Sequence, residues 1–357
     1  MMRGFIVAIC VLIGGSVQAQ VGQGDSSARS ALEDVVAEVE AHYAGFFDKV
    51  NPSTRSSYDT MLAELRSNLS ENSATDCIGQ YLAWFQDLHL RAQVAGRRLD
   101  AFERKPVNYA DSMVYSPRLT AGKVNDDCFL IRIPTLALQP GPRSPIVQMI
   151  RQYKRSQCPF LILDLRGNSG GNDWYLPLVE LAYDHPAAVE GTTFRNTGEN
   201  RAFLLEGMKG NRAIKKAVEE SARVRDSLAV LRSDHVLSFK KVSSYPRRIA
   251  VILDNQVASN AENLVLALQS VSERVILYGR DPSMGCADYT NPRPFAVSSL
   301  DMVVMIPTCR SGRLPDYRVD PAGIAPDVRI PLSLPQELTN NIDTWTRWVA
   351  DDLTRPK

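Results

Sequence analysis

The sequence predicts an α/β protein in which a mixed sheet is flanked by helices and preceded by a small N-terminal helical subdomain. Two observations carry this prediction. Residues 31–86 repeat apolar side chains at three-to-four spacing, which is the pattern of amphipathic helices. Beyond Asp126, short apolar runs alternate with helical patterns, which favours a largely parallel or mixed sheet covered by helices. We therefore expect a helical subdomain over residues 31–86 and an α/β domain over residues 87–357.

The first 19 residues have the pattern of a secretory signal peptide. Arg3 supplies a positive charge, residues 5–13 form an apolar run too short to span a bilayer, and VQA ending at Ala19 is a small-residue cleavage site. We expect cleavage after Ala19, a periplasmic or secreted protein, and no stable membrane anchor. Lipidation at Cys10 is the alternative, disfavoured because this cysteine lies inside the apolar run.

The segments that follow each have a pattern of their own. Residues 20–30 are rich in Gly and Ser and are expected to be a disordered linker. Residues 89–96 alternate apolar and polar side chains, as a half-buried strand does, with His89 on the polar face. Residues 199–235 are charged and helical in pattern and resemble an insertion, either a lid over a cleft or a solvated excursion. The remaining strands are expected at 128–136, 159–167, 247–255 and 274–279, with a hairpin at 289–307 completing the sheet, and the helices at 144–155, 173–183 and from Ser259 onward.

Composition argues against several kinds of partner. The 41 Lys and Arg nearly balance the 40 Asp and Glu, so charge gives no reason to expect nucleic acid or an anionic membrane. The chain has no CxxC and no HExxH, and its four histidines are scattered, so we expect no metal and no cofactor. An exported protein can form disulfides. Cys286 and Cys309 are the favoured pair because they flank the predicted hairpin, and free thiols are an equal alternative.

Ser259 stands at the corner between an apolar strand and a helix, where two interpretations fit. With Glu262 three residues later, it matches a capping box, in which the serine side chain caps the helix. A helix N-terminus also presents free N–H groups and the positive end of the helix dipole, which suit a developing oxyanion. The local pattern therefore leaves a cap and a nucleophile as alternatives.

A glycine turn, residues 167–171 (GNSGG), follows another apolar strand. Adjacent glycines allow the backbone to turn sharply and to approach a ligand closely. The carboxyl ends of strands are also where ligands bind in open α/β sheets. The alternative is an ordinary tight turn, and a phosphate loop is excluded because the lysine of GxxxxGK[ST] is missing.

Four segments gain meaning when they are taken together and in order. They are DLHL (87–90), LDLRGNSGG (163–171), VASNAE (257–262) and GIAPDVRI (323–330). They resemble, respectively, the D-G-H-T, D-L-R-x-N-x-G-G, T-A-S-x-A-E and G-[IV]-x-P-D-[IV]-x-[IV] motifs of the tail-specific or C-terminal-processing serine peptidase superfamily. That superfamily includes tricorn-type core proteases and the repeats of interphotoreceptor retinoid-binding protein. The resemblance implies a ClpP/crotonase-like core and a serine peptidase with Ser259 as the nucleophile.

The resemblance also suggests the general base. One branch of the superfamily uses a lysine about two dozen residues after the serine, but this chain has no lysine between Lys241 and Lys357. The other branch uses an upstream histidine, which His89 within DLHL matches. The alternative for His89 is an ordinary surface histidine. A neutral imidazole would take the proton of the serine hydroxyl and later give it to the leaving amine.

Three other roles follow only from the resemblance. The oxyanion hole is expected from the N–H of Asn260 and an N–H of Gly170 or Gly171. The residue supporting the histidine is expected at Asp320, where tricorn-type members carry a glutamate that acts through a serine beside the histidine. Here that neighbour is Leu88, which has no hydroxyl, so Asp87 is the local alternative.

Two departures bear on the function. Members that process protein tails usually carry a PDZ domain, and residues 91–126 are too few for one. A fold of this kind can also hold ligands without catalysis, as the retinoid-binding repeats do. The expected function is an exported serine peptidase acting on a peptide or protein substrate. The alternatives are a non-catalytic ligand- or peptide-binding module and a serine esterase.

Overall fold

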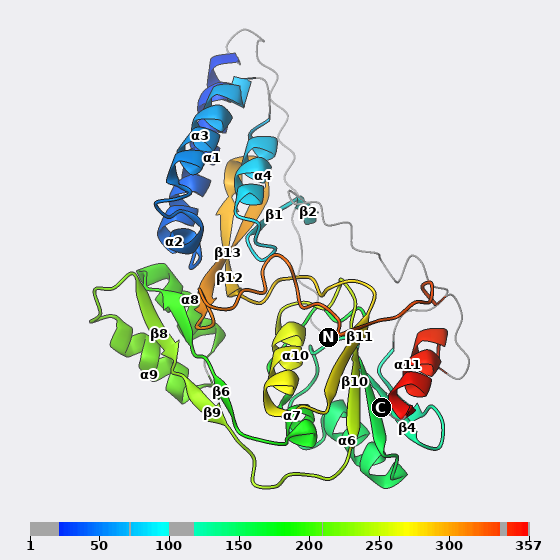
Figure 1. Ribbon diagram of the computed structural model, residues 1–357. Helices are drawn as coiled ribbons and strands as arrows, with labels where there is room; N and C mark the ends of the chain where they lie inside the picture. The colour runs from blue at the N-terminus through cyan, green and yellow to red at the C-terminus, as the bar shows by residue number, and fades with distance from the viewer. Residues whose placement is uncertain (1–20, 71–72, 100–117, 209, 336–340, 356–357) are drawn as a thin grey trace, which may run out of the picture.

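The computed structural model describes residues 21–70, 73–99, 118–208, 210–335 and 341–355, so the expected signal peptide lies outside it. Its N-terminal part is helical, as predicted, with α1 (Val21–His42), α2 (Phe46–Lys49), α3 (Arg55–Ser67) and α4 (Ala74–Trp84). Figure 1 shows these helices packed alongside the β12–β13 hairpin, at one end of the molecule and away from the parallel sheet. The helices and the hairpin share one apolar core, which includes Leu32, Tyr81, Val304 and Ile306.

A mostly parallel six-stranded sheet forms the centre of the α/β part. The strand order is β14 (Val328–Arg329), β11 (Val275–Gly279), β10 (Arg248–Ile252), β5 (Phe160–Asp164), β4 (Cys128–Arg132) and β3 (Thr120–Lys123). All neighbours pair in parallel except β3, which is antiparallel to β4. The register aligns Ile252 with Asp164 and Asp164 with Arg132, so three strands reach their carboxyl ends together.

Helices cover both faces of this sheet (Figure 1). On one face, α6 (Pro145–Ser156), α7 (Leu176–Ala182) and α10 (Asn260–Val271) pack on side chains such as Leu163 and Val251. On the other face, α11 (Thr344–Thr354) packs on Ile162 and Ala250. Alternate residues of β5 and β10 thus point to opposite apolar layers, which explains why both strands are apolar throughout.

A second, antiparallel sheet corrects the prediction of a single sheet. Its order is β2 (Arg97–Leu99), β1 (Arg91–Val94), β13 (Met302–Ser311), β7 (Thr192–Arg195) and β8 (Leu228–Arg232), and β12 (Tyr289–Val297) also pairs with β13. The hairpin therefore does not extend the parallel sheet. Its apolar face, with Tyr289 and Val304, is buried against the helical subdomain instead.

Two other expectations are wrong in part. The Gly/Ser-rich residues 21–30 are not a disordered linker but the first turns of α1, since the helix begins at Val21. Residues 199–235 hold α8 (Gly198–Gly207) and α9 (Arg212–Ser221), but the segment then forms strand β8. The chain between β6 (Ala187–Val189) and β9 (His235–Leu237) is thus integrated into the second sheet through β7 and β8.

Cys286 and Cys309 do not form a disulfide, and both are free thiols. Cys309 lies on β13, where its sulfur accepts a hydrogen bond from Asn291 Nδ2 at 3.2 Å. Cys286 precedes β12 and lies beside His89. The two thiols therefore have different neighbours, Asn291 for Cys309 and His89 for Cys286.

Residues 100–117 are outside the described chain, so the expected lack of a PDZ domain stays a prediction. Among the described helices, none combines the length and apolar character needed to cross a membrane.

Candidate active site

The two turns that follow β5 and β10 meet at the carboxyl edge of the parallel sheet. The Ala258 N–H donates to Asn168 O at 3.0 Å, and the Gly167 N–H donates to Asp254 Oδ2 at 3.0 Å. Gly170 has φ +96°, and a Cβ there would lie 2.9 Å from Ala258 O and 3.0 Å from Ser259 Cβ. Only glycine fits this position, because both the backbone conformation and the close approach exclude a side chain.

Ser259 occupies a strained corner immediately before α10. Its φ of 57° and ψ of −125° are rarely adopted by residues other than glycine. Ser259 and Glu262 are placed as in a capping box, and the Ser259 N–H donates to Glu262 Oε2 at 3.0 Å. The Glu262 N–H donates to the Ser259 carbonyl oxygen at 2.9 Å, and it also faces the serine side-chain oxygen, as the capping box requires. A cap of this kind uses the serine oxygen only as an acceptor, so the hydroxyl proton stays available to a base.

The backbone around Ser259 provides unused N–H donors. The N–H groups of Ala261 and Glu262 bond to the carbonyl groups of Ala258 and Ser259, whereas that of Asn260 has no partner within the described chain. In the glycine turn, the Gly170 N–H donates to Asn168 Oδ1 at 2.9 Å, and that of Gly171 has no partner there either. Asn260 Nδ2 donates to Gly171 O at 2.7 Å and so fastens the helix N-terminus to the turn. Among the described residues, the N–H groups of Asn260 and Gly171 are thus unpaired donors, one at the helix N-terminus and one in the turn that is fastened to it.

His89 lies in a turn between α4 and β1. The His89 N–H donates to Asp87 Oδ1 at 2.8 Å, and the Leu90 N–H donates to Asp87 O at 3.2 Å. The Nδ1 atom of His89 is 2.6 Å from the carbonyl oxygen of Tyr289. A carbonyl group only accepts, so Nδ1 carries the proton and Nε2 keeps its lone pair. Burial lowers the pKa of His89, and the nearby Asp87 carboxylate opposes this shift. The resting imidazole is therefore neutral and basic at Nε2.

The turns that carry His89 and Ser259 are joined through shared neighbours. Cys286 Sγ lies 3.2 Å from His89 Nδ1, and the Cys286 N–H donates to Glu262 Oε2 at 2.8 Å, the oxygen that also accepts the Ser259 N–H. Leu88 and Ala258, the residues just before His89 and Ser259, pack on Cys286 in one small apolar cluster. Sequence reasoning missed this role of Cys286 and that of the Tyr289 carbonyl.

Glu262 is more than a capping residue. Its side chain is fully buried and also accepts hydrogen bonds from Ser283 Oγ at 2.6 Å and from the Gly285 N–H at 2.7 Å. Burial raises the pKa of Glu262, and these donors oppose the shift. The capping-box spacing was the available signal for Glu262, but its contacts with residues 283–286 join segments that are distant in sequence.

Asp320 lies in the same region but makes no hydrogen bond to His89 among the described residues. Its Oδ1 accepts the N–H groups of Ala287 at 2.6 Å and of Asp288 at 3.1 Å. Its Oδ2 is buried without a partner. Burial first, then the nearby charges of Asp87 and Asp288, raise the pKa of Asp320 well above its ordinary value. The residues in contact with His89 are instead Asp87, Cys286 and Tyr289.

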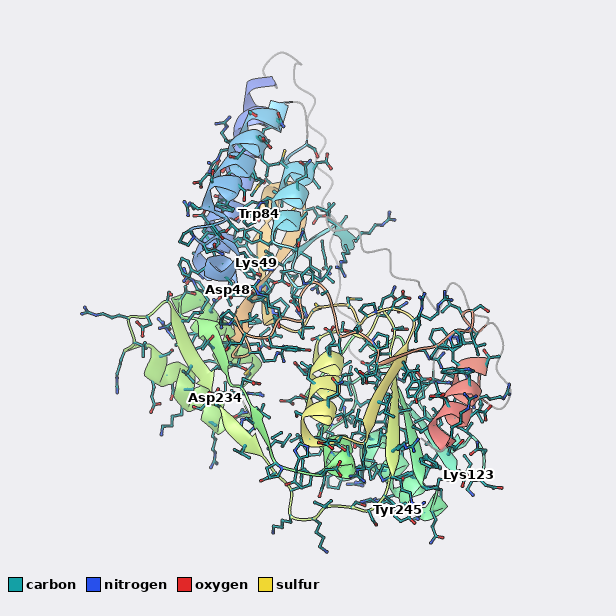
Figure 2. All side chains as sticks on the ribbon, in the orientation of Figure 1. Asp48, Lys49, Trp84, Lys123, Asp234 and Tyr245 are labelled. Atoms are coloured by element: carbon teal, nitrogen blue, oxygen red, sulfur yellow. The ribbon has the colours of Figure 1, made fainter. Side chains whose placement is uncertain are left out.

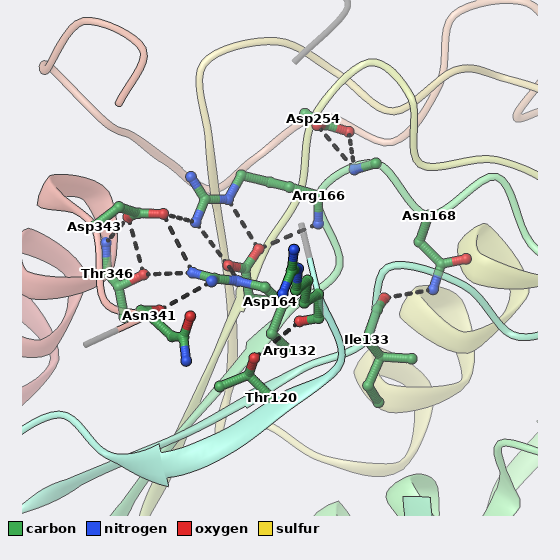
Figure 3. Close-up of polar contacts among 12 residues, drawn as sticks. Thr120, Arg132, Ile133, Asp164, Arg166, Asn168, Asp254, Asn341, Asp343 and Thr346 are labelled. Carbon is green, nitrogen blue, oxygen red and sulfur yellow. Dashed lines mark hydrogen bonds and ion pairs between the residues drawn. The ribbon is translucent and has the colours of Figure 1, made fainter. Parts of the chain in front are cut away.

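A buried ion-pair cluster surrounds Arg166, the residue that precedes the glycine turn (Figure 3). Asp164 Oδ2 binds Arg132 Nε at 2.7 Å and Arg166 Nη2 at 2.6 Å, and Asp343, the N-cap of α11, binds the same Arg166 nitrogen at 2.6 Å. Burial alone would raise the pKa of Asp164, but the two guanidinium groups hold it below its ordinary value. The cluster fixes Arg166, the residue before Gly167, to β4, β5 and α11.

Comparisons with known proteins show the family and the fold. A family model described as Peptidase family S41 matches residues 127–330. A solved structure from Parabacteroides merdae, described as a peptidase, has a TM-score of 0.58 at 15% identity over 86% of this chain and 90% of that one. Mature CPAF has a TM-score of 0.54 at 12% identity over 92% of this chain and 96% of that one. At these identities the two structures show a shared fold. No curated protein matches the sequence.

Proposed function

Because the chain belongs to peptidase family S41 and is a serine-type peptidase, we propose that it cleaves peptide bonds with Ser259 as nucleophile and His89 as general base. The observation that carries the proposal is the 2.6 Å contact of His89 Nδ1 with the Tyr289 carbonyl. It leaves Nε2 as the proton acceptor that a serine nucleophile requires. The strained Ser259 corner at a helix N-terminus supports the same assignment.

The reaction would proceed through an acyl-enzyme. His89 Nε2 takes the hydroxyl proton while Ser259 Oγ bonds to the carbonyl carbon, and the oxyanion accepts hydrogen bonds from the N–H groups of Asn260 and Gly171. The imidazolium then protonates the leaving amine as the peptide C–N bond breaks. A water molecule, deprotonated by His89, attacks the ester and releases the second product and the free serine. We assign the stabilisation of the imidazolium to the Asp87 carboxylate.

Asp320 has a more distant role in this proposal. Its carboxyl group holds the N–H groups of Ala287 and Asp288, which directly precede Tyr289. It would therefore position the carbonyl that accepts the His89 proton, rather than touch the imidazole. We assign the second oxyanion donor to Gly171 rather than Gly170, because the Gly170 N–H already donates to Asn168 Oδ1.

We also propose that the protein is exported by the N-terminal segment 1–19 and acts in the periplasm or outside the cell. The charge, apolar run and cleavage site in that segment support this. The substrate class would then be a peptide or protein met after export. Detection of a mature chain starting at Gln20 in the exported fraction would test the proposal, and retention of the full-length chain in the cytoplasm would contradict it.

The catalytic assignment is tested with a fluorophosphonate probe and a peptide library. Wild-type protein should be labelled at Ser259 and should cleave peptides, and Ser259→Ala should do neither while remaining folded. Ser270→Ala is the matched control, since it removes a hydroxyl from the same helix, where Ser270 bonds only to Ala267 O. Full activity in folded Ser259→Ala would overturn the assignment. Ester cleavage without peptide cleavage would indicate an esterase, and neither labelling nor cleavage would indicate a binding module.

A further inference from the structure

We infer that Tyr43, in the helical subdomain, is a positioning residue for His89 that acts through Asp87. The inference rests on the proposed function of His89. Tyr43 lies at the end of α1 and is fully buried. Its hydroxyl donates to Asp87 Oδ2 at 2.8 Å, while the other oxygen of the same carboxylate accepts the His89 N–H at 2.8 Å. One phenol therefore fixes the side chain that shapes the His89 turn.

Tyr43 also contacts the second group that orients His89. Its ring centroid lies 5.4 Å from that of Tyr289, whose carbonyl accepts the Nδ1 proton. A side chain on Gly45 would collide with the Tyr43 hydroxyl and come within 2.7 Å of Tyr289 Cε1, so glycine lets the chain close over both rings. The Tyr289 hydroxyl donates in turn to Asp48 Oδ2 at 3.0 Å. Figure 2 labels Asp48 at the foot of the helical subdomain.

The chemistry gives the Tyr43 hydroxyl a specific task. Asp87 is only 4% exposed, and a buried carboxylate requires hydrogen-bond donors in place of water. Burial raises the pKa of Tyr43 well above its ordinary value, so the phenol stays protonated and remains a donor. The Asp87 charge favours the protonated imidazole, which is the form that arises in the transition state. Holding that charge in place should therefore lower the barrier.

The same subdomain contains a hydroxyl suited as a matched control. Tyr58 is also fully buried, and its hydroxyl donates to Glu40 Oε1 at 2.7 Å. This pair resembles the pair of Tyr43 and Asp87 in its chemistry and in the burial of the tyrosine, although Glu40 is only partly buried. Among the described residues, Tyr58 forms no hydrogen bond or ring contact with His89, Asp87 or Tyr289, and its hydroxyl also lies 3.2 Å from that of Tyr81. Loss of either phenol hydroxyl removes one hydrogen bond from a buried tyrosine to a carboxylate, but only one of the two lies next to the site.

The test compares Tyr43→Phe with Tyr58→Phe by thermal unfolding and by separate determination of kcat and KM on one peptide. Tyr43→Phe should lower kcat about tenfold with KM nearly unchanged, as expected for one hydrogen bond to a charged group. Tyr58→Phe should show a similar loss of stability and an unchanged kcat. In an Asp87→Asn background, Tyr43→Phe should cause no further loss of kcat, because its effect passes through Asp87.

Several outcomes would overturn the inference. Wild-type kcat in Tyr43→Phe, an equal loss in Tyr58→Phe, or an undiminished Tyr43→Phe effect in Asp87→Asn would each do so. Should Tyr43→Phe not fold, Asp87→Asn alone is the second variant, and wild-type kcat there would overturn the inference. A wild-type protein without Ser259-dependent hydrolysis would refute the proposed function and this inference with it. An active wild type with an indifferent Tyr43→Phe would refute the inference alone.

Discussion

Replacement of Gly170 by alanine should damage activity far more than a methyl group usually does. The φ of +96° is a conformation that costs an alanine on the order of 1–3 kcal/mol. The added Cβ would stand 2.9 Å from Ala258 O and 3.1 Å from Asn260 N, and relieving such overpacking costs about 1–3 kcal/mol more. The sum, roughly 2–6 kcal/mol, is a large part of the 5–15 kcal/mol of a typical domain.

The activity loss follows from which atoms must move. The groups nearest the new Cβ belong to Ala258, Ser259 and Asn260, so relaxation displaces the nucleophile and an oxyanion donor together. A displacement near 1 Å costs about a hundredfold in rate. We therefore expect kcat to fall about a hundredfold, measured on peptide at a temperature where the variant is shown to be folded.

Gly122→Ala is the control for this prediction. Gly122 lies on β3, has an ordinary φ, and a Cβ there would meet nothing within 4 Å. It should leave both the melting temperature and kcat close to wild type. The reasoning would be refuted by a Gly170→Ala variant that melts with the wild type and retains its kcat, since the close approach would then have no consequence.

Three further predictions concern the base and the ion-pair cluster. His89→Ala should lower kcat about 10²–10⁴-fold, whereas His235→Ala, at an exposed position on β9, should not; equal activity in both variants would remove His89 from the mechanism. Burial holds the pKa of His89 below 6.5, and the neutral form is the active base, so kcat/KM should stay high as pH falls to 6.5 and decline only below it; an acid limb centred above pH 6.5 would contradict this. Asp343→Ala should destabilise the protein by about 3–5 kcal/mol in urea unfolding, because it removes one partner of a buried ion pair with Arg166. Ser144→Ala, which removes only the N-cap of α6, should cost about 1 kcal/mol, and a similar cost in the two variants would show that the ion pairs contribute little.

The sequence predicts those parts of the fold that depend on local pattern. The apolar runs at 159–167 and 247–255 correspond to β5 and β10 because a strand buried on both faces has no polar side to alternate with. The helical subdomain is likewise confirmed, from α1 to α4. The place of the 289–307 hairpin is not predictable in this way. Which sheet the hairpin joins depends on its packing against helices more than 200 residues earlier, and the local sequence pattern does not indicate that packing.

The candidate site is likewise predictable from the sequence only in part. Ser259, the glycine turn and His89 carry side chains or backbone preferences that motifs record, and the structure brings their turns to one set of neighbours. The partner of His89 Nδ1 is a main-chain carbonyl, which every residue type possesses, so no sequence pattern could have indicated Tyr289. The choice of Cys286 and Cys309 as a pair failed for a related reason, because flanking a hairpin does not make two residues neighbours across it.

The ion pair between Arg166 and Asp343 has a consequence for the order in which the molecule is completed. Asp343 is translated 177 residues after Arg166 and begins the last helix of the described chain. Docking of that helix adds the Asp343 carboxylate to the ion pairs that already join Arg132 and Arg166 to Asp164. The position of the residue before Gly167, and with it the glycine turn, therefore depends in part on a segment that is translated late.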